Sequence, residues 1–254
     1  MGTRLKANPN GGFHFLPGID PYSSGVIADS GWEIVHATLA RPLVWNRGLD
    51  AARRYLEGIG RTRHSLCGVE LRCPEPFSFD GFGDFNRQYH AVLDEWDLLV
   101  DGANPVARTN VAPVTGAPSE SVLYGFSYTV PNDTRRSSFV VAGGGELLDG
   151  GLQKNQIVRV GETSDEALLE KSVRVVEIMR HRLSGLGVDQ SLLSAVDIYT
   201  AHPIHRLMAE VVVPEFPAAA QLGVHWYHAR PPVREIEFEM DLRGVSREVV
   251  LDLR

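Results

Sequence analysis

Two stretches, Gly31-Trp-Glu-Ile-Val-His-Ala-Thr-Leu39 and Ser137-Ser-Phe-Val-Val-Ala-Gly-Gly-Gly145, each open a pass through the same order of segments. Each β-rich opening is followed by an amphipathic helix, a strand ending at a proline, a second helix, a proline-led strand and a last β stretch. The first pass runs from about Pro17 to Tyr128 and the second from about Ser137 to Leu242. A repeat this long predicts duplicated domains, because solenoid periods are shorter.

The repeat predicts an α+β fold built from two similar domains, each a mixed β-sheet with two helices packed on one face. The proline-led strands, predicted over 104–114 and 216–227, support it, since Pro105 and Pro217 lie 112 residues apart. The boundaries expected from the sequence are a flexible lead-in over 1–16, a first domain over 17–130 and a second over 131–254. The polar residues 131–136 are typical of a turn or short linker between them.

The composition is that of an ordinary globular protein, with 43% hydrophobic and 22% charged residues. A net charge of −7 and dispersed arginines argue against a nucleic-acid partner. The apolar runs are too short to span a bilayer, so we expect no membrane partner. The sequence has two cysteines, Cys67 and Cys73, and its start does not resemble a secretory signal, which predicts a reduced cytoplasmic protein with buried structural thiols.

Helix and strand signals are clearest in the second pass. Thr163 and Glu166 form a predicted capping box, and Gly185 and Gly187 predict the helix end. Between them an apolar face recurs at helical spacing through Leu169, Val173, Val176, Met179 and Leu183. Further on, apolar and acidic residues alternate over 235–241, which predicts a strand with one acidic face. The matching strand of the first pass, 122–130, is more apolar than 235–241 and is expected to be covered on both faces.

Three motifs of the first pass resemble the Rid family of imine and enamine deaminases. They are Ile19-Asp-Pro-Tyr-Ser-Ser-Gly-Val26, Phe82-Gly-Asp-Phe-Asn-Arg-Gln-Tyr89 and Pro105-Val-Ala-Arg-Thr-Asn-Val111, in that order. In the second pass, Val233-Arg-Glu-Ile-Glu-Phe-Glu239 resembles the family's closing strand. The likeness covers residues 17 to 242. It implies a chorismate-mutase-like fold in each domain and assembly as a homotrimer with clefts between neighbouring domains.

The resemblance also implies a site. Arg108 falls on the arginine that grips the substrate carboxylate, Tyr22 and Asn86 fall on cleft residues, and Glu237 falls on the glutamate that activates water. Strand alternation adds Asn110 to the face of Arg108. A guanidinium suits this role because its planar fork matches a carboxylate bidentately.

The sequence also departs from the family pattern. Ala37 and Ala142 stand where the family has a small hydroxyl residue, and neither pass carries both the arginine and the glutamate. We therefore expect one shared site, in which Glu237 of one domain faces Arg108 of another. For Glu237, crowding by neighbouring carboxylates would raise the pKa, whereas the alternative is an ordinary solvated strand face. For Arg108, the alternative is a structural ion pair.

Two other patterns invite different chemistry. The pairs His202-Pro-Ile-His205 and His225-Trp-Tyr-His228 raise the alternative of zinc binding, but Pro203 and strand spacing separate the rings, so we expect no metal. The run from Ala142 to Gly151 lacks the lysine of a phosphate loop and predicts a strand end and turn, where a small ligand can approach the main chain.

The function expected from these residues is hydrolytic deamination of a small carboxylate-bearing imine or enamine, without cofactor. Arg108 anchors the carboxylate and Glu237 activates water. Two alternatives stay open: a chorismatase-like hydrolase acting on a cyclic carboxylate, and a non-catalytic metabolite-binding or assembly protein in which Arg108 still holds an anion.

Overall fold

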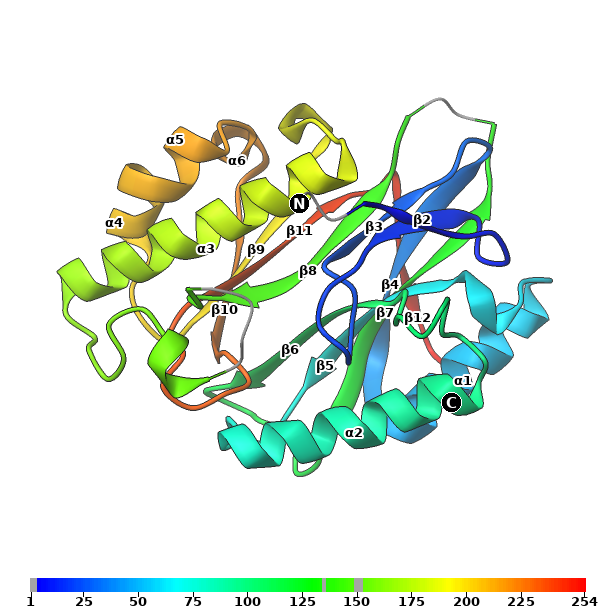
Figure 1. Cartoon of the computed structure of the whole chain (residues 1–254), viewed down its shortest axis with the longest axis horizontal. Coiled ribbons are helices and arrows are strands. Elements are labelled where there is room, and N and C mark those ends of the chain that lie inside the picture. Colours follow the sequence, from blue (N-terminus) through cyan, green and yellow to red (C-terminus); the bar gives the residue numbers. More distant parts are fainter. Residues whose placement is uncertain (1–3, 134–135, 149–152) are drawn as a thin grey trace.

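A computed structural model describes residues 4–133, 136–148 and 153–254 of the chain (Figure 1). Its helices are α1 (Trp45–Gly58), α2 (Phe79–Glu95), α3 (Asp165–Leu186), α4 (His205–Leu207), α5 (Val213–Glu215) and α6 (Ala218–Leu222), with a π-helical turn over Met208–Val212. Its strands are β1 (Lys6–Asn8), β2 (Phe13–Leu16), β3 (Gly25–Ala28), β4 (Trp32–Val44), β5 (Leu66–Arg72), β6 (Ala107–Pro113), β7 (Val122–Pro131), β8 (Phe139–Gly145), β9 (Ala195–Thr200), β10 (His225–Arg230), β11 (Glu239–Gly244) and β12 (Arg247–Leu251).

The strands described here join in one mixed sheet in the order β1-β2-β3-β8-β11-β9-β10-β6-β5-β7-β4-β12. In the first half of the chain the order is β4-β7-β5-β6, antiparallel except for the parallel pair β5–β6. The second half repeats this as β8-β11-β9-β10, with β9–β10 parallel. The halves meet where β6 pairs with β10. The observed architecture is therefore the predicted α+β class, with a large mixed sheet.

The sheet folds over so that β6 contacts β8 from the opposite half, and helices lie on the two outer sides (Figure 1). Helices α1 and α2 cover β4, β5 and β7, and α3 with α4–α6 covers β8, β9 and β11. Between the two sheet faces lies a smaller apolar cluster that includes Ala107 of β6 and Ala142 of β8. Small residues permit this close approach: a Cβ atom on Gly143 of β8 would lie 3.1 Å from Cγ2 of Thr109 on β6.

The chain ends cross between the halves. Strands β1 to β3 extend the sheet of the second half, and β12 pairs in parallel with β4 of the first half. Residues 6–8 and 13–16 are therefore strands, and the prediction of a flexible lead-in is wrong there, because Phe13 and Phe15 are fully buried. The domain boundary at 130/131 stays a prediction; residues 134–135 of the predicted linker lie outside the described residues.

Other predictions are confirmed or shifted. The long helix ends at Gly187 with φ of 70°, as predicted, but its cap is Ser164, whose side chain accepts from the Ala167 amide, and not Thr163. Within this helix, Val173 is 42% exposed although periodicity placed it on the apolar face. The proline-led strand predicted over 216–227 is a short helix first and becomes a strand only at His225.

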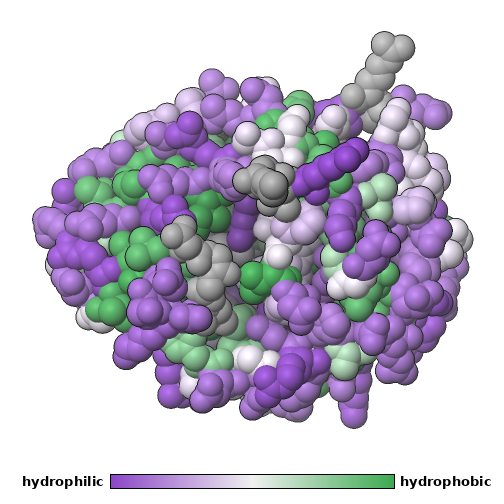
Figure 2. All heavy atoms as spheres, in the orientation of Figure 1, coloured by the Kyte–Doolittle hydropathy of each residue, from purple (hydrophilic) through white to green (hydrophobic). Residues whose placement is uncertain are grey.

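The surface is mixed in character. Figure 2 shows hydrophilic side chains over most of one face, with apolar atoms gathered on the side where α3 to α6 lie in Figure 1. Within the described residues, every helix is too short or too polar to cross a membrane.

Candidate active site

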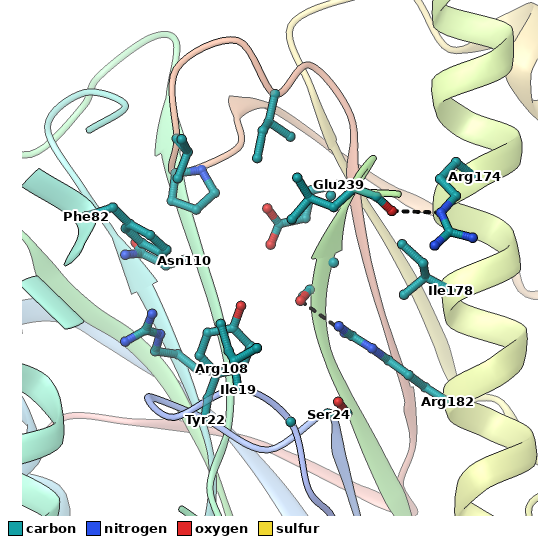
Figure 3. Close-up of a pocket in the computed structure, with 18 of the residues that line it drawn as sticks. Ile19, Tyr22, Ser24, Phe82, Arg108, Asn110, Arg174, Ile178, Arg182 and Glu239 are labelled. Atoms are coloured by element: carbon teal, nitrogen blue, oxygen red, sulfur yellow. Dashed lines mark hydrogen bonds between the residues drawn. The ribbon is translucent and has the colours of Figure 1, made fainter. Parts of the chain in front are cut away.

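A cavity of about 360 Å³ lies between the two halves of the sheet and the inner face of α3 (Figure 3). In Figure 3, one wall carries Ile19, Tyr22, Phe82, Arg108 and Asn110, the other carries Arg174, Ile178 and Arg182, and Glu239 lies between them. The main chain of Gly143, Gly144 and Gly145 forms part of the lining. Three arginines and one acid make the cavity electropositive, which favours an anionic ligand.

Arg108 lies on β6 with its side chain buried, at 3% exposure. Its Nη2 donates to Oδ1 of Asn86 on α2 at 2.5 Å, and its guanidinium lies 4.9 Å from the Tyr22 ring centroid and 4.7 Å from that of Tyr89. Helix α2 supports this arrangement because the Ser78 side chain caps its first turn. The guanidinium is therefore held in one orientation by an amide and by aromatic faces.

Two buried donors in this wall lack a partner in the part of the chain that the structure describes. They are Nη1 of Arg108 and Nδ2 of Asn110, which share one face of β6 and both line the cavity. The Asn110 Oδ1 accepts from the Cys73 thiol, so its amide nitrogen remains available. Burying unpaired donors is costly, and an acceptor bound between them would relieve that cost. The pair therefore fits a carboxylate of a ligand.

Glu239 begins β11 and is buried, with 5% exposure. The preceding backbone is anchored by the buried Glu146 carboxylate, which accepts from the amides of Glu237 and Phe238 and pairs with Lys171 at 3.0 Å. Burial raises the pKa of Glu239 to about 8; Arg182 opposes this rise and Glu146 adds to it. The carboxyl group is therefore largely protonated at neutral pH and can act as a general acid.

Space for this carboxyl depends on Gly143. A Cβ atom at that position would lie 2.2 Å from Oε1 of Glu239. Gly143→Ala is therefore expected to displace the carboxyl and lower kcat/KM about 100-fold, since an error of about 1 Å in a catalytic group costs that much. Gly58→Ala is the matched control, because nothing lies within 4 Å of its added methyl group. A folded Gly143→Ala protein with wild-type kcat/KM would contradict this assignment.

The raised pKa of Glu239 also predicts a pH effect on stability. The unfolded carboxyl titrates near its ordinary value of 4.5 and the folded one at about 8, so the folded chain binds the extra proton between these values. This group therefore lowers stability as pH rises through that window, by about 1.4 kcal/mol per unit. Glu239→Gln should match wild-type Tm near pH 4 and exceed it increasingly toward pH 8. A Tm difference that stays constant over that range would refute the shift.

The structure brings together most of the residues predicted for the site. Tyr22, Arg108 and Asn110 line the cavity, and Asn86 supports Arg108 from behind. Glu237 does not line it: its carboxylate bonds His202 at 2.9 Å and Arg230 at 3.2 Å. The prediction that Glu237 faces Arg108 is therefore not met within the chain, because Glu237 precedes β11 and points to His202 and Arg230 instead.

Sequence reasoning missed Glu239 and Arg182. The predicted acidic face of 235–241 is not solvated: Glu239 and Asp241 are both buried, and Asp241 accepts from Thr109 at 2.7 Å and Tyr199 at 2.9 Å. The alternation of apolar and acidic residues did predict an acidic face here. It gave no reason to choose Glu239 over Glu237 as the residue of the site.

The remaining candidate groups have structural partners. His202 bonds Glu237, and His225 bonds Asp197 at 2.7 Å. Across the described residues, no group of three histidine, cysteine, aspartate or glutamate side chains is placed to hold a metal. Cys67 and Cys73 are buried thiols, as predicted, and burial raises the pKa of Cys73 to about 12. The glycine run ends β8 as predicted; its residues 149–151 lie outside the described part.

The fold and this site define an α+β protein whose electropositive cavity suits a small anion and holds a buried acid. The chain belongs to a deaminase family: the family model described as 2-aminomuconate deaminase CnbZ matches residues 5–249. A 2-amino-5-chloromuconate deaminase of Comamonas testosteroni is 39% identical over 244 residues, covering 95% of this chain and 96% of that protein. The prediction of a deaminase is thereby confirmed.

Solved structures are more distant. A chorismatase structure covers 92% of this chain and 77% of its own, with a TM-score of 0.46 and 13% identity. A Thermotoga maritima MSB8 protein assigned as an endoribonuclease covers 43% of this chain and 80% of its own, with a TM-score of 0.30 and 18% identity. Neither likeness is close enough to carry an argument about function.

Proposed function

We propose that this protein hydrolyses the C–N bond of an enamine or imine carboxylate of the aminomuconate type, releasing ammonia. The observation that carries the proposal is one cavity lined by the buried Arg108, whose Nη1 has no partner among the described residues, and by the buried Glu239, whose pKa is raised to about 8. The family and the Comamonas testosteroni relative support it, because both are named for deamination of aminomuconates.

In this proposal Arg108 and Asn110 bind the carboxylate next to the carbon that bears nitrogen. Nη1 of Arg108 and Nδ2 of Asn110 supply the two free donors, and Asn86 and the neighbouring rings fix the guanidinium plane. When the carboxylate is bound, the adjacent carbon that bears nitrogen is also held in place. The reaction then takes place between groups that are already positioned. Tyr22, whose ring stacks on Arg108, completes that wall.

Glu239 then carries each proton in turn. Its carboxyl protonates the enamine carbon to give an iminium, and the resulting carboxylate takes a proton from water as the water oxygen bonds to the C=N carbon. The carboxyl returns that proton to nitrogen, the C–N bond breaks with its electron pair leaving on ammonia, and the new hydroxyl loses its proton to Glu239 as the carbonyl forms. The sum is enamine plus water giving ketone plus ammonia, with Glu239 again protonated.

We also propose that the two halves derive from a tandem duplication of a Rid-like domain. The identical strand order and direction of β4-β7-β5-β6 and β8-β11-β9-β10 support this. After such a duplication, the first half has kept the arginine, Arg108, and the second half has kept the acid, Glu239. Folding of the chain brings the two residues to a single cavity.

The function is tested by measuring ammonia released from 2-aminomuconate by the purified protein, with 2-amino-5-chloromuconate as a second substrate. Release well above the spontaneous rate, from at least one of them, is the expected result. Imines made from ordinary amino acids by an amino-acid oxidase serve as comparison substrates. Ammonia release no faster than the spontaneous rate from both muconates would overturn the proposal.

A further inference from the structure

The wall opposite Arg108 carries a second arginine without an acidic partner. Arg182 lies on α3, and its Nη1 donates to the carbonyl oxygens of Ala142 at 2.7 Å and Gly143 at 3.0 Å. Within the described residues no carboxylate lies within ion-pair distance of it, whereas Arg180, two positions earlier, pairs with Glu215 at 2.9 Å. The carbonyls fix the side chain but carry no formal charge to neutralise it.

The positions of the two arginines relate them to one ligand. Arg182 and Arg108 both line the cavity, from α3 and from β6 (Figure 3). The hydroxyl of Tyr22 lies within the field of both, since each lowers its pKa against the rise caused by burial. Among the described lining residues, Glu239 is the only acid and is expected to be protonated, and Arg174 pairs with Glu177 at 3.3 Å. The cavity therefore holds two separate positive charges that need anions.

Apolar side chains make up another part of the cavity lining. They are those of Phe82, Ile178, Val233 and Ile236. A flat hydrocarbon chain with a carboxylate at each end would match this pattern, whereas a ligand with one carboxylate and a methyl end would leave one guanidinium unpaired.

We propose that Arg182 forms a second carboxylate subsite, which binds the far carboxylate and selects dicarboxylic enamines over imines of monocarboxylic acids. The selection rests on the proposed function, since Arg108 binds the reacting end of the same ligand and Glu239 lies between the two arginines (Figure 3). Arg182 is a specificity-determining residue here: it binds the end of the substrate that does not react.

Two unreactive ligands test this by calorimetry. trans,trans-Muconate and sorbate share the same six-carbon diene, and sorbate carries a methyl group where muconate has its second carboxylate. The wild-type protein should bind muconate about 10- to 100-fold more tightly, as expected for a charge-assisted contact. Arg182→Met should weaken muconate to about the affinity of sorbate and leave sorbate nearly unchanged. Arg108→Met should weaken both ligands, and Arg180→Met, the control on the same helix, neither.

Equal wild-type affinities, binding of neither ligand, or equal losses of both ligands in Arg182→Met would each overturn the second subsite. The test does not depend on turnover. Muconate-selective binding with no ammonia release from aminomuconates would leave the subsite standing and remove the proposed function. Ammonia release with equal, Arg182-independent binding of the two ligands would do the reverse.

Discussion

Arg108→Met is expected to lower kcat/KM for 2-aminomuconate by about 10²- to 10³-fold. Removing one partner of a buried, hydrogen-bonded ion pair costs about 2–5 kcal/mol, and each 1.4 kcal/mol is a factor of ten. In the complex, Arg108 would make such a pair with the substrate carboxylate through its free Nη1. Steady-state ammonia release over a range of substrate concentrations measures the loss.

The same variant should not lose stability, and this separates a binding role from a structural one. Burial lowers the pKa of Arg108, which shows that its charge is poorly compensated in the free protein. Methionine fills a similar volume without a charge to desolvate, so Tm should be unchanged or higher. A large fall in Tm with kcat/KM retained would instead assign Arg108 to the core.

Glu239→Gln is expected to lower kcat by about 10²- to 10⁴-fold, the usual contribution of a positioned general acid or base. Glutamine keeps the shape of the side chain but cannot release a proton, so KM should change little. Single-turnover ammonia release separates this loss from product release. A kcat within a few-fold of the wild type would show that protons move by another route.

The pH profile of the wild type follows from the same group. Catalysis starts from protonated Glu239, and kcat/KM reports the pKa of the free enzyme. With a pKa of about 8, kcat/KM should be level below that pH and fall about tenfold per unit above it. The Glu239→Gln protein, at its low residual rate, should not show this fall in kcat/KM above pH 8.

Local patterns predicted the helices and strands well but not their long-range pairing. Each segment has to bury its apolar side chains, whichever neighbour it packs against. This requirement is visible locally in the helical spacing around Val176 and Met179 and in the mostly apolar segment 122–130. The crossing of β12 to β4, and of β3 to β8, depends on contacts between distant segments. The alternation of apolar and polar residues along a strand does not indicate which strand it pairs with. A flexible lead-in was therefore predicted where β1 and β2 form.

The site shows the same division. Arg108 and Asn110 could be predicted because motif and alternation agree on one strand face. Glu239 could not be predicted, because alternate residues from 235 to 241 are all acidic. Only the structure shows that the carboxyl group beside Gly143 in the cavity is that of Glu239. Arg182 lies beside exposed residues of an amphipathic helix, where sequence favours a solvated charge.

The most direct test compares Glu239→Gln with Glu237→Gln in ammonia release from 2-aminomuconate. The two acids lie two residues apart, yet only Glu239 lines the cavity with Arg108, while Glu237 pairs with His202 and Arg230. We predict that Glu239→Gln loses at least about 100-fold in kcat and that Glu237→Gln stays within a few-fold of the wild type. The opposite order, with Glu237→Gln inactive and Glu239→Gln active, would contradict a single-chain site built on Arg108 and Glu239.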